Sequence, residues 1–343
     1  ASMEISGIPF QGEWKAEEGT TYFNTPYLYK ENGFKEKKTA ETMMQALKKE
    51  AVIEKIEKKK ETKQAPLLYN LTELQNECTR LFKISPEETL KVVQELYERK
   101  LVTYPRTDAR VLSTAVAKEI GKNLRGLCQY PLLAQEARTV LEENRFQKLS
   151  STKYVNDKQI TDHYAIIPTG QGLNNLNHLS PLHAKVYETI ARRFVAIFYP
   201  PTIYRKVAIE TLVPYETEEK APEHFFAGFR IMEQEGYLKV MKYSFLKERK
   251  KETDEAEEKS QEENENKVVG AELFEALGKL KKGVAGAVTE FSIKEGETSP
   301  PKRYNSGSLM LAMENAGQLI EDEELRAQIK GSGIGTSATR AGI

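Results

Sequence analysis

A single tyrosine stands inside the stretch from Leu101 to Asp108, directly before Pro105 and two residues before Arg106. Tyrosine phenols titrate near pH 10, so at neutral pH they attack only when a neighbouring charge stabilises the phenolate or the group under attack. Arg106 can supply that charge, because a guanidinium stays protonated and its planar fork matches two phosphate oxygens. The pair of Tyr104 and Arg106 therefore suits attack on a phosphodiester.

The same residues also have a purely structural interpretation. Proline fixes its own φ and disfavours the helical region for the residue before it, so Pro105 ends the incoming segment at Tyr104. In a simple turn Tyr104 would pack, Arg106 would be solvated, and Thr107 or Asp108 would cap the next helix. The residue types alone leave both interpretations open.

Three separated motifs resemble those of one enzyme family. Thr-Tyr-Pro-Arg-Thr-Asp at 103–108 resembles the active-site signature of the type IA DNA topoisomerases, which cut one DNA strand and hold its 5′ end as a phosphotyrosine. Asp-His-Tyr-Ala-Ile-Ile-Pro-Thr at 162–169 resembles their second box, and the stretches at 300–304 and 333–340 resemble their late elements. Proline after the tyrosine and the Ala-Ile-Ile-Pro-Thr run are similar to topoisomerase III rather than to bacterial topoisomerase I.

The resemblance implies roles for six residues. Tyr104 would be the nucleophile and Arg106 would stabilise the phosphate, whereas the remaining four would contact DNA: His163, Arg303, Thr339 and Arg340. On its surroundings alone, a histidine beside an aspartate is more often a surface or structural residue. Glycines near the late arginines favour close approach to an anion, although an ordinary flexible connection remains the alternative.

The chain departs from the family pattern at several places. Tyr164 replaces the acidic residue or second histidine usual there, so it receives no role. Ser337 stands where the family usually has proline, and Asn305-Ser306 stand where it often has Thr-Glu. These departures weaken the roles of individual late residues more than the family resemblance itself.

The resemblance also implies a domain and a cofactor outside this sequence. The residues before Tyr104 show no Asp-x-Asp pair and are too few for the family's Toprim domain, which supplies the Mg²⁺ carboxylates. We therefore expect an internal fragment that binds no metal, with single-stranded DNA and the missing Toprim domain as its partners. Its end at Ile343 falls within a family element.

Charge is unevenly distributed along the 343 residues, which carry 51 basic and 51 acidic side chains. Eight acids and two bases fall between Lys251 and Asn266, which leaves the rest mildly basic, with 49 basic and 43 acidic residues. That acidic run has too little apolar surface to offset its ordering entropy, so we expect a solvated loop. A partner-binding or DNA-mimicking role is the alternative.

The sequence also bears on the cellular compartment. No apolar run reaches the length of a membrane span, and the start lacks the basic and apolar regions of a signal peptide, so we expect a cytoplasmic protein without membrane contact. Cys78 and Cys128 are the only cysteines. Their spacing supports neither a disulfide framework nor a zinc site, and we expect both to be small buried hydrophobic residues.

Periodicity and capping signals predict the elements. Helices are expected after Thr39 to about residue 50, after Asn70 and Ser85 with capping boxes, from Ser113 to Ile120, from Leu132 to Glu143, and from Ser180 to Pro200. Strands are expected among residues 5–33 and at 203–213, 225–229 and 284–293. Residues 51–60 fit either period, and the resemblance favours a strand. Residues 104–112 are expected to connect two helices.

Together these signals predict an α+β, multidomain fold. Its β-rich arch domain covers 1–63 and 201–302, an inserted, mostly helical domain with the tyrosine covers 64–200, and a further helical DNA-binding domain starts at 303. As part of an intact type IA topoisomerase, the chain would cleave one strand, pass another and reseal the first. The rival hypothesis is a non-enzymatic DNA-binding or assembly module in which Tyr104 is structural.

Overall fold

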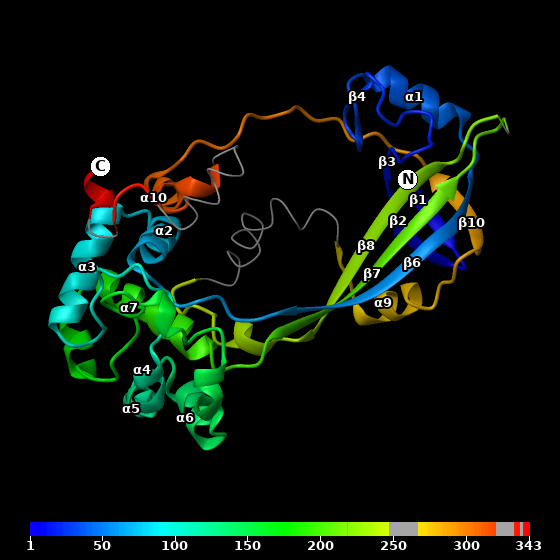
Figure 1. The fold of residues 1–343 in the computed structure, drawn as a ribbon. Coiled ribbons are helices and arrows are strands. Elements are labelled where there is room, and N and C mark those ends of the chain that lie inside the picture. The colour runs from blue at the N-terminus through cyan, green and yellow to red at the C-terminus, as the bar shows by residue number, and fades with distance from the viewer. Residues whose placement is uncertain (218, 247–266, 320–332, 337–338) are drawn as a thin grey trace. The chain divides into compact units, whose positions relative to one another are not determined.

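The computed structural model describes residues 1–217, 219–246, 267–319, 333–336 and 339–343 (Figure 1). The acidic run from Lys251 to Asn266 lies outside these residues. The chain divides into two compact units. Unit 1 comprises Ala1–Thr62, Ile203–Gln234 and Glu248–Pro300, and unit 2 comprises Lys63–Thr202, Glu235–Lys247 and Pro301–Ile343. Within the described residues, none of the helices combines the length and apolar character that crossing a membrane requires.

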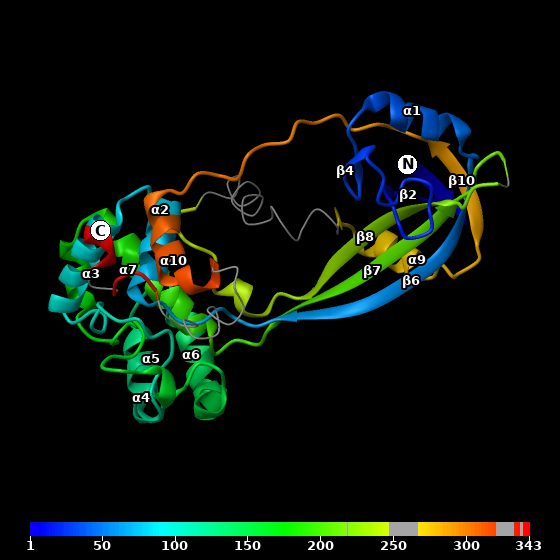
Figure 2. The ribbon, with the colours of Figure 1, turned by 45° about the horizontal axis from the view of Figure 1, so that its top comes forward.

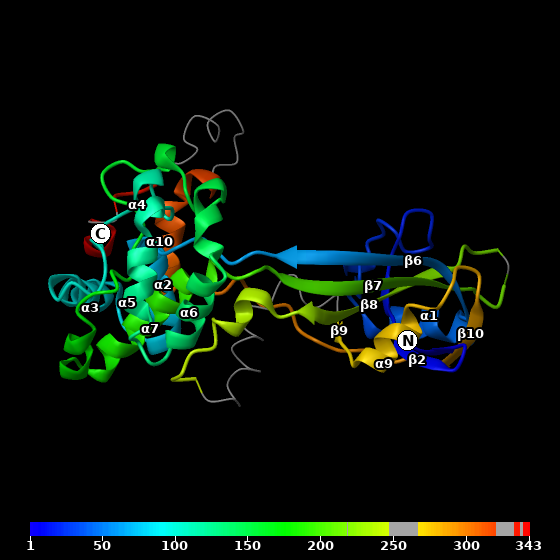
Figure 3. The same ribbon diagram turned by 90° about the horizontal axis from the view of Figure 1, so that it is seen from below.

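Unit 1 is built on one sheet, in which the described residues form eight strands with the order β2-β1-β10-β6-β7-β8-β3 and β9 paired to β8. The pairings of β1 with β2 and β10, of β10 with β6, and of β8 with β3 and β7 are antiparallel, whereas β9 runs parallel to β8. The strands are β1 Ser2–Ile5, β2 Ile8–Gln11, β3 Glu13–Lys15, β6 Glu50–Lys63, β7 Thr202–Val213, β8 Glu223–Gln234, β9 Lys267–Val268 and β10 Ala285–Glu290. Figure 3 shows the long strands β6, β7 and β8 side by side.

The core of unit 1 lies on one face of this sheet. Alternate residues of β7, Val207, Ile209 and Val213, are buried, as are Ala51 and Ile53 of β6. Alternation of this kind is what a sheet with one buried face requires. The other elements among the described residues of the unit are helix α1 Lys37–Ala46, helix α9 Ala271–Leu277 and the hairpin β4 Leu28–Lys30 with β5 Gly33–Phe34.

Unit 2 is helical. In its described part the α-helices are α2 Leu71–Phe82, α3 Pro86–Glu98, α4 Thr114–Glu119, α5 Gly121–Leu127, α6 Ala134–Glu142, α7 Pro181–Ala196 and α10 Ser306–Glu314. Short 3-10 turns are η1 Arg145–Ser151, η2 Asp157–Gln159, η3 Leu173–His178, η4 Gly236–Lys239, η5 Ala316–Leu319 and η6 Arg340–Gly342. Figure 2 shows α10 lying along α2, and Gly307 of α10 permits this approach, because a Cβ there would lie 2.9 Å from the Cα of Asn76.

Capping side chains mark the helix starts that the sequence predicts. Asn70, Ser85, Ser113 and Ser180 each accept a hydrogen bond from a backbone N–H in the first turn of the helix that each precedes. A cap of this kind contributes about 0.5–2 kcal/mol, which is why it marks a helix start in the sequence. Residues 51–60, which fit two periods, form part of strand β6. The first helix ends at Ala46, earlier than expected, because residue 50 already belongs to β6.

The two cysteines differ in their surroundings. Cys78 is fully buried in the core of unit 2, and burial raises the pKa of its thiol, as expected for a small hydrophobic residue. Cys128 is only partly buried, and its Sγ donates to the carbonyl of Leu124 at 3.4 Å. The prediction of full burial is therefore confirmed for Cys78 alone.

Candidate functional site

Two stretches of unit 2 that are far apart in the sequence lie side by side around Tyr104. The segment that begins at Leu101 pairs antiparallel with the second motif through a bridge between Val102 and Pro168. The N–H of Thr103 donates to the carbonyl of Ile167 at 3.0 Å, and the N–H of Thr169 donates to the carbonyl of Leu101 at 3.0 Å. The backbone on the N-terminal side of Tyr104 is therefore fixed to the segment that carries His163.

The two threonines that flank the tyrosine strengthen this link. Thr103 Oγ1 donates to the carbonyl of Ala165 at 3.1 Å and accepts from the N–H of Ile167 at 3.0 Å. Thr107 Oγ1 donates to the carbonyl of His163 at 2.9 Å and accepts from the N–H of Ala109 at 3.1 Å. Each threonine side chain thus links the two motifs by hydrogen bonds.

Tyr104 is half-buried between two aromatic rings. Its ring centroid lies 4.4 Å from that of His163, with an interplanar angle of 45°. On another side the ring of Tyr97, from α3, meets it edge to face at 5.4 Å. Aromatic pairs of this kind contribute about 0.5–1.5 kcal/mol each beyond the area that they bury, so the two contacts favour the observed orientation of the Tyr104 ring.

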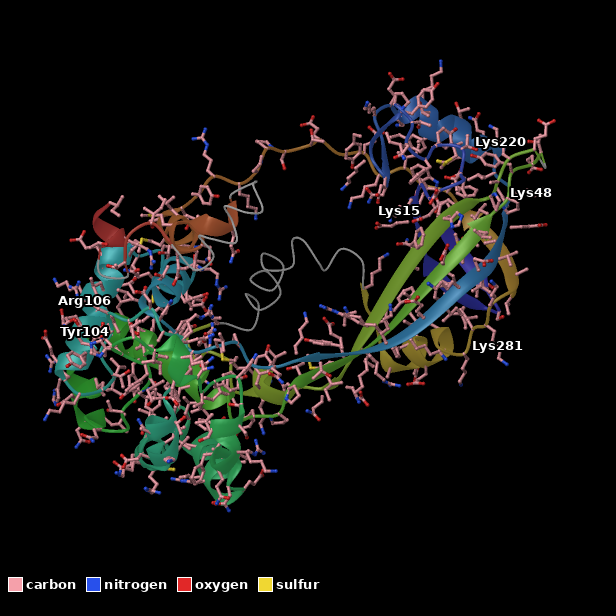
Figure 4. The ribbon with its side chains drawn as sticks, in the orientation of Figure 1. Lys15, Lys48, Tyr104, Arg106, Lys220 and Lys281 are labelled. Atoms are coloured by element: carbon pink, nitrogen blue, oxygen red, sulfur yellow. The ribbon has the colours of Figure 1, made fainter. Side chains whose placement is uncertain are left out.

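Arg106 is exposed, whereas its neighbours Pro105 and Thr107 are buried. Figure 4 labels Tyr104 and Arg106 next to one another in unit 2. The alternation of buried and exposed residues turns the guanidinium outward from a loop whose backbone is held by its neighbours. The alternative in which Thr107 or Asp108 caps the next helix is not found, because Ser113 caps α4.

The late candidate residues also lie in unit 2. Arg303 is exposed and stands two residues before Asn305, which caps α10 in a capping box. Thr339 is exposed, and its Oγ1 accepts from the N–H of Thr336 at 2.9 Å. Gly335 has φ +68°, a conformation that a residue with a side chain rarely adopts, so the tight turn depends on this glycine.

Arg340 differs from the other candidates because it is buried. Its Nη1 donates to Asp108 Oδ1 at 3.2 Å and to Thr72 Oγ1 at 3.1 Å, and its Nε donates to the carbonyl of Ile334 at 3.1 Å. The structure therefore brings together Tyr104 with His163. Separately, it brings Arg340 to Asp108, at the C-terminal end of the loop of residues 103–108, which we call the tyrosine loop.

A partly buried carboxylate accompanies Arg340. Burial raises the pKa of Glu314 in α10, although the nearby Arg340 guanidinium and a hydrogen bond from Asn70 Nδ2 at 2.8 Å oppose the shift. A raised pKa in the folded state means that folding favours the protonated form. The Glu314 carboxyl therefore destabilises the fold once pH rises above the pKa that it has in the unfolded state.

Glu314→Gln is therefore expected to raise the melting temperature of the chain at pH 7, because the amide keeps an acceptor for Asn70 without a buried charge. The difference from wild type should shrink as pH falls toward about 4.3 and vanish below it, where the glutamate is protonated in both the folded and the unfolded state. Thermal unfolding followed by circular dichroism at several pH values measures it. A lower melting temperature for the variant at pH 7 would contradict the argument.

The residues that hold the tyrosine loop escape prediction from the sequence. Thr103 and Thr107 stand out there only as parts of a motif, and Asn70 only as a helix cap, although its Nδ2 also donates to the carbonyl of Asp108 at 3.1 Å. The signal that could have found them is the pair of threonines in the motif, one directly before Tyr104 and one three residues after it. Tyr97 carries no signal, since it fits the apolar stripe of α3.

Comparison with known proteins adds to this geometry. A family model described as DNA topoisomerase matches residues 11–343. DNA topoisomerase 3 of Bacillus licheniformis is 36% identical over 299 residues, which are 86% of this chain and 37% of that protein. DNA topoisomerase 3 of Bacillus subtilis is 33% identical over 341 residues, or 98% of this chain and 43% of that protein. The chain thus spans about two-fifths of the length of these relatives.

A solved structure agrees at the level of the fold. The full-length topoisomerase I of Thermotoga maritima superimposes with a TM-score of 0.56 at 18% identity, covering 99% of this chain and 45% of that one. The mixed α+β, multidomain fold expected from the sequence is therefore confirmed. With a family match over nearly its whole length and relatives above 30% identity, the chain belongs to the type IA DNA topoisomerases and is similar to topoisomerase 3.

Proposed function

We propose that this chain is the tyrosine-bearing part of a topoisomerase III-like enzyme that cuts one DNA strand, passes another strand through the break and reseals it. The observation that carries the proposal is the contact between Tyr104 and His163, whose ring centroids lie 4.4 Å apart on two motifs joined by hydrogen bonds. In a simple turn nothing would require these motifs to meet. Family membership supports the same activity for the intact protein.

In the proposed reaction the Tyr104 oxygen attacks the phosphorus of a phosphodiester. A phosphorus–tyrosine bond forms, the bond to the 3′ oxygen breaks, and the DNA 5′ end stays on the protein. The phenol loses its proton and the leaving 3′ oxygen gains one, while Arg106 stabilises the negative charge that develops on the phosphate. Resealing reverses each of these transfers, so no net bond energy is lost.

Exposed polar residues of unit 2 are the proposed DNA contacts. His163, Arg303 and Thr339 are all exposed, and none of these residue types needs a particular base to bind a phosphate. We therefore propose that single-stranded DNA is held chiefly by its sugar-phosphate backbone. We also propose a cytoplasmic location, as expected from a sequence without a signal-peptide pattern at its start.

The proposed binding site for Mg²⁺ lies in a domain outside these 343 residues. In the described ranges no group of three or more His, Cys, Asp or Glu side chains is arranged to hold a metal ion, so no step is assigned to a metal bound here. We propose that a Toprim domain of the same protein binds Mg²⁺ and supplies the acid that protonates the leaving oxygen.

The test is incubation of the 343-residue chain with labelled single-stranded DNA and Mg²⁺, followed by denaturing electrophoresis. We expect binding whose affinity falls steeply with salt, because phosphate contacts release counterions. Cleavage should be undetectable, since the missing acid alone is worth about a hundredfold to ten-thousandfold. Adding the Toprim domain should restore a covalent adduct.

Two outcomes would count against the proposal. Tyr104-dependent cleavage by the chain alone would mean that the catalytic acid lies within these residues. DNA binding without any adduct in the intact protein would instead favour a binding or assembly module in which Tyr104 only packs. The same intact protein with a Tyr104→Phe change distinguishes a true adduct from tight binding.

A further inference from the structure

The strongest unassigned feature of unit 2 is the burial of an arginine close to the tyrosine loop. Arg340 is 7% exposed, although it belongs to the last turn of the described chain, η6. Its Nε and Nη1 atoms donate to Ile334, Thr72 and Asp108, and Nη1 lies 4.0 Å from Glu314 Oε1. The hydrogen-bond donors of this guanidinium are therefore directed at groups of the protein itself.

What Arg340 holds is the end of the loop that carries Tyr104. Asp108 lies four residues after Tyr104, and its side chain is 52% exposed despite this contact. On the other side Asn70 Nδ2 donates to the Asp108 carbonyl at 3.1 Å, and the N–H of Leu71 donates to the Thr107 carbonyl at 3.1 Å. The loop end is therefore clamped between the start of α2 and Arg340.

This clamp connects to the second motif through one further bond. Thr107 Oγ1 donates to the carbonyl of His163 at 2.9 Å, so Asp108 is connected through Thr107 to the segment of His163 as well as to the backbone of Tyr104. Each step of the path from Arg340 through Asp108 and Thr107 is either a peptide bond or a direct hydrogen bond. Reacting atoms must be placed to within a fraction of an ångström for efficient attack, so the stiffness of this loop bears on the rate.

The charges around Arg340 also oppose the binding of a phosphate there. A phosphate that took the Arg340 guanidinium would have to displace Asp108 and Thr72, and would come close to the Glu314 carboxyl. Separating the buried Arg340 guanidinium from these partners is costly, because its charge is then left with less compensation inside the protein. Arg303, which is exposed in the same part of the chain, meets no such obstacle.

We propose that Arg340 is a positioning residue, which acts through Asp108 to fix the Tyr104 loop, and is not a ligand of DNA. The proposal rests on the proposed function for its effect on cleavage, but its structural part stands without it. Through Arg340, the described residues 333–336 and 339–343 support the reactive loop and are not part of the DNA-binding surface.

The experiment compares Arg340→Gln with Arg303→Gln as a matched loss of one positive charge. Hydrogen exchange of the 101–112 region and the salt dependence of single-stranded DNA binding are measured on the 343-residue chain. Arg340→Gln should speed exchange around Thr107 and leave the salt slope unchanged. Arg303→Gln should leave exchange unchanged and reduce the slope by about 0.7, the contribution of one phosphate contact to a single strand.

Covalent adduct formation by the intact protein supplies the second readout. Arg340→Gln should slow it about 10²-fold, the cost of an ångström-scale misplacement, and Arg340→Lys should recover part of the rate. Asp108→Ala should slow adduct formation similarly. The double variant should be no slower than either single variant, because each single change already removes the same contact between Arg340 and Asp108. If Arg340→Gln fails to fold, Asp108→Ala, at a half-exposed side chain, gives the same test.

Results in the opposite pattern would overturn the proposal. A reduced salt slope with unchanged exchange in Arg340→Gln would make Arg340 a phosphate ligand. Additive effects of the Arg340 and Asp108 changes would show that they act independently. If the wild-type intact protein forms no Tyr104 adduct, the proposed function fails, whereas exchange and salt dependence still decide the role of Arg340.

Discussion

Tyr104→Phe is expected to abolish the covalent protein–DNA adduct of the intact protein, with a loss of strand-passage activity of at least about 10⁴-fold. The change removes only the hydroxyl that we propose forms the phosphorus–oxygen bond, and loss of a nucleophile typically costs on the order of 10⁶-fold. Labelled single-stranded DNA, trapped with detergent and followed by electrophoresis, measures the adduct. The phenyl ring still meets His163 and Tyr97, so the melting temperature should stay within about 2 °C.

The matched control is Tyr29→Phe, an exposed tyrosine in hairpin β4–β5 of unit 1. It loses the same atom at a site with no proposed role, so adduct formation should equal that of the wild type. DNA binding should persist in both variants. An adduct of normal amount in Tyr104→Phe, attached to another tyrosine, would refute the assignment of the nucleophile.

Glu188→Ala is expected to destabilise unit 2 by about 3–5 kcal/mol, because it breaks a buried ion pair and leaves a charge without compensation. Glu188 is 2% exposed on α7 and accepts from Arg192 Nε at 2.6 Å and from the N–H of Ser244 at 2.7 Å. Arg192 Nη1 also donates to the Val240 carbonyl at 2.8 Å. The pair therefore anchors residues 240–244 to α7. Thermal unfolding should show a decrease of roughly 6–20 °C in the melting temperature.

An exposed ion pair of unit 1 provides the comparison. Glu275 Oε1 lies 2.7 Å from Arg205 Nη2, with about half of each side chain exposed. Glu275→Ala should cost no more than about 1 kcal/mol, since water screens such pairs and ordering long side chains opposes them. Equal destabilisation by the Glu188 and Glu275 changes would mean that burial does not decide the strength of these pairs.

The sequence by itself determined the elements whose signals are local. Helix starts at Ser85, Ser113 and Ser180 could be predicted because each capping side chain accepts a hydrogen bond from a backbone N–H only three residues later. Strand β7 could be predicted because the alternation from Val207 to Val213 matches a sheet with one buried face. The family could be recognised because its motifs keep their order and spacing.

Tertiary structure decided which residues support the candidate site. Thr107 and His163 are 56 residues apart, and Arg340 and Asp108 are 232 apart, so no local pattern reports either contact. By residue type Arg303 and Arg340 are equal candidates for a phosphate, and only the fold makes one exposed and the other buried. The physical reason is that capping and periodicity act within a few residues, whereas burial and long-range pairing depend on how the whole of unit 2 packs.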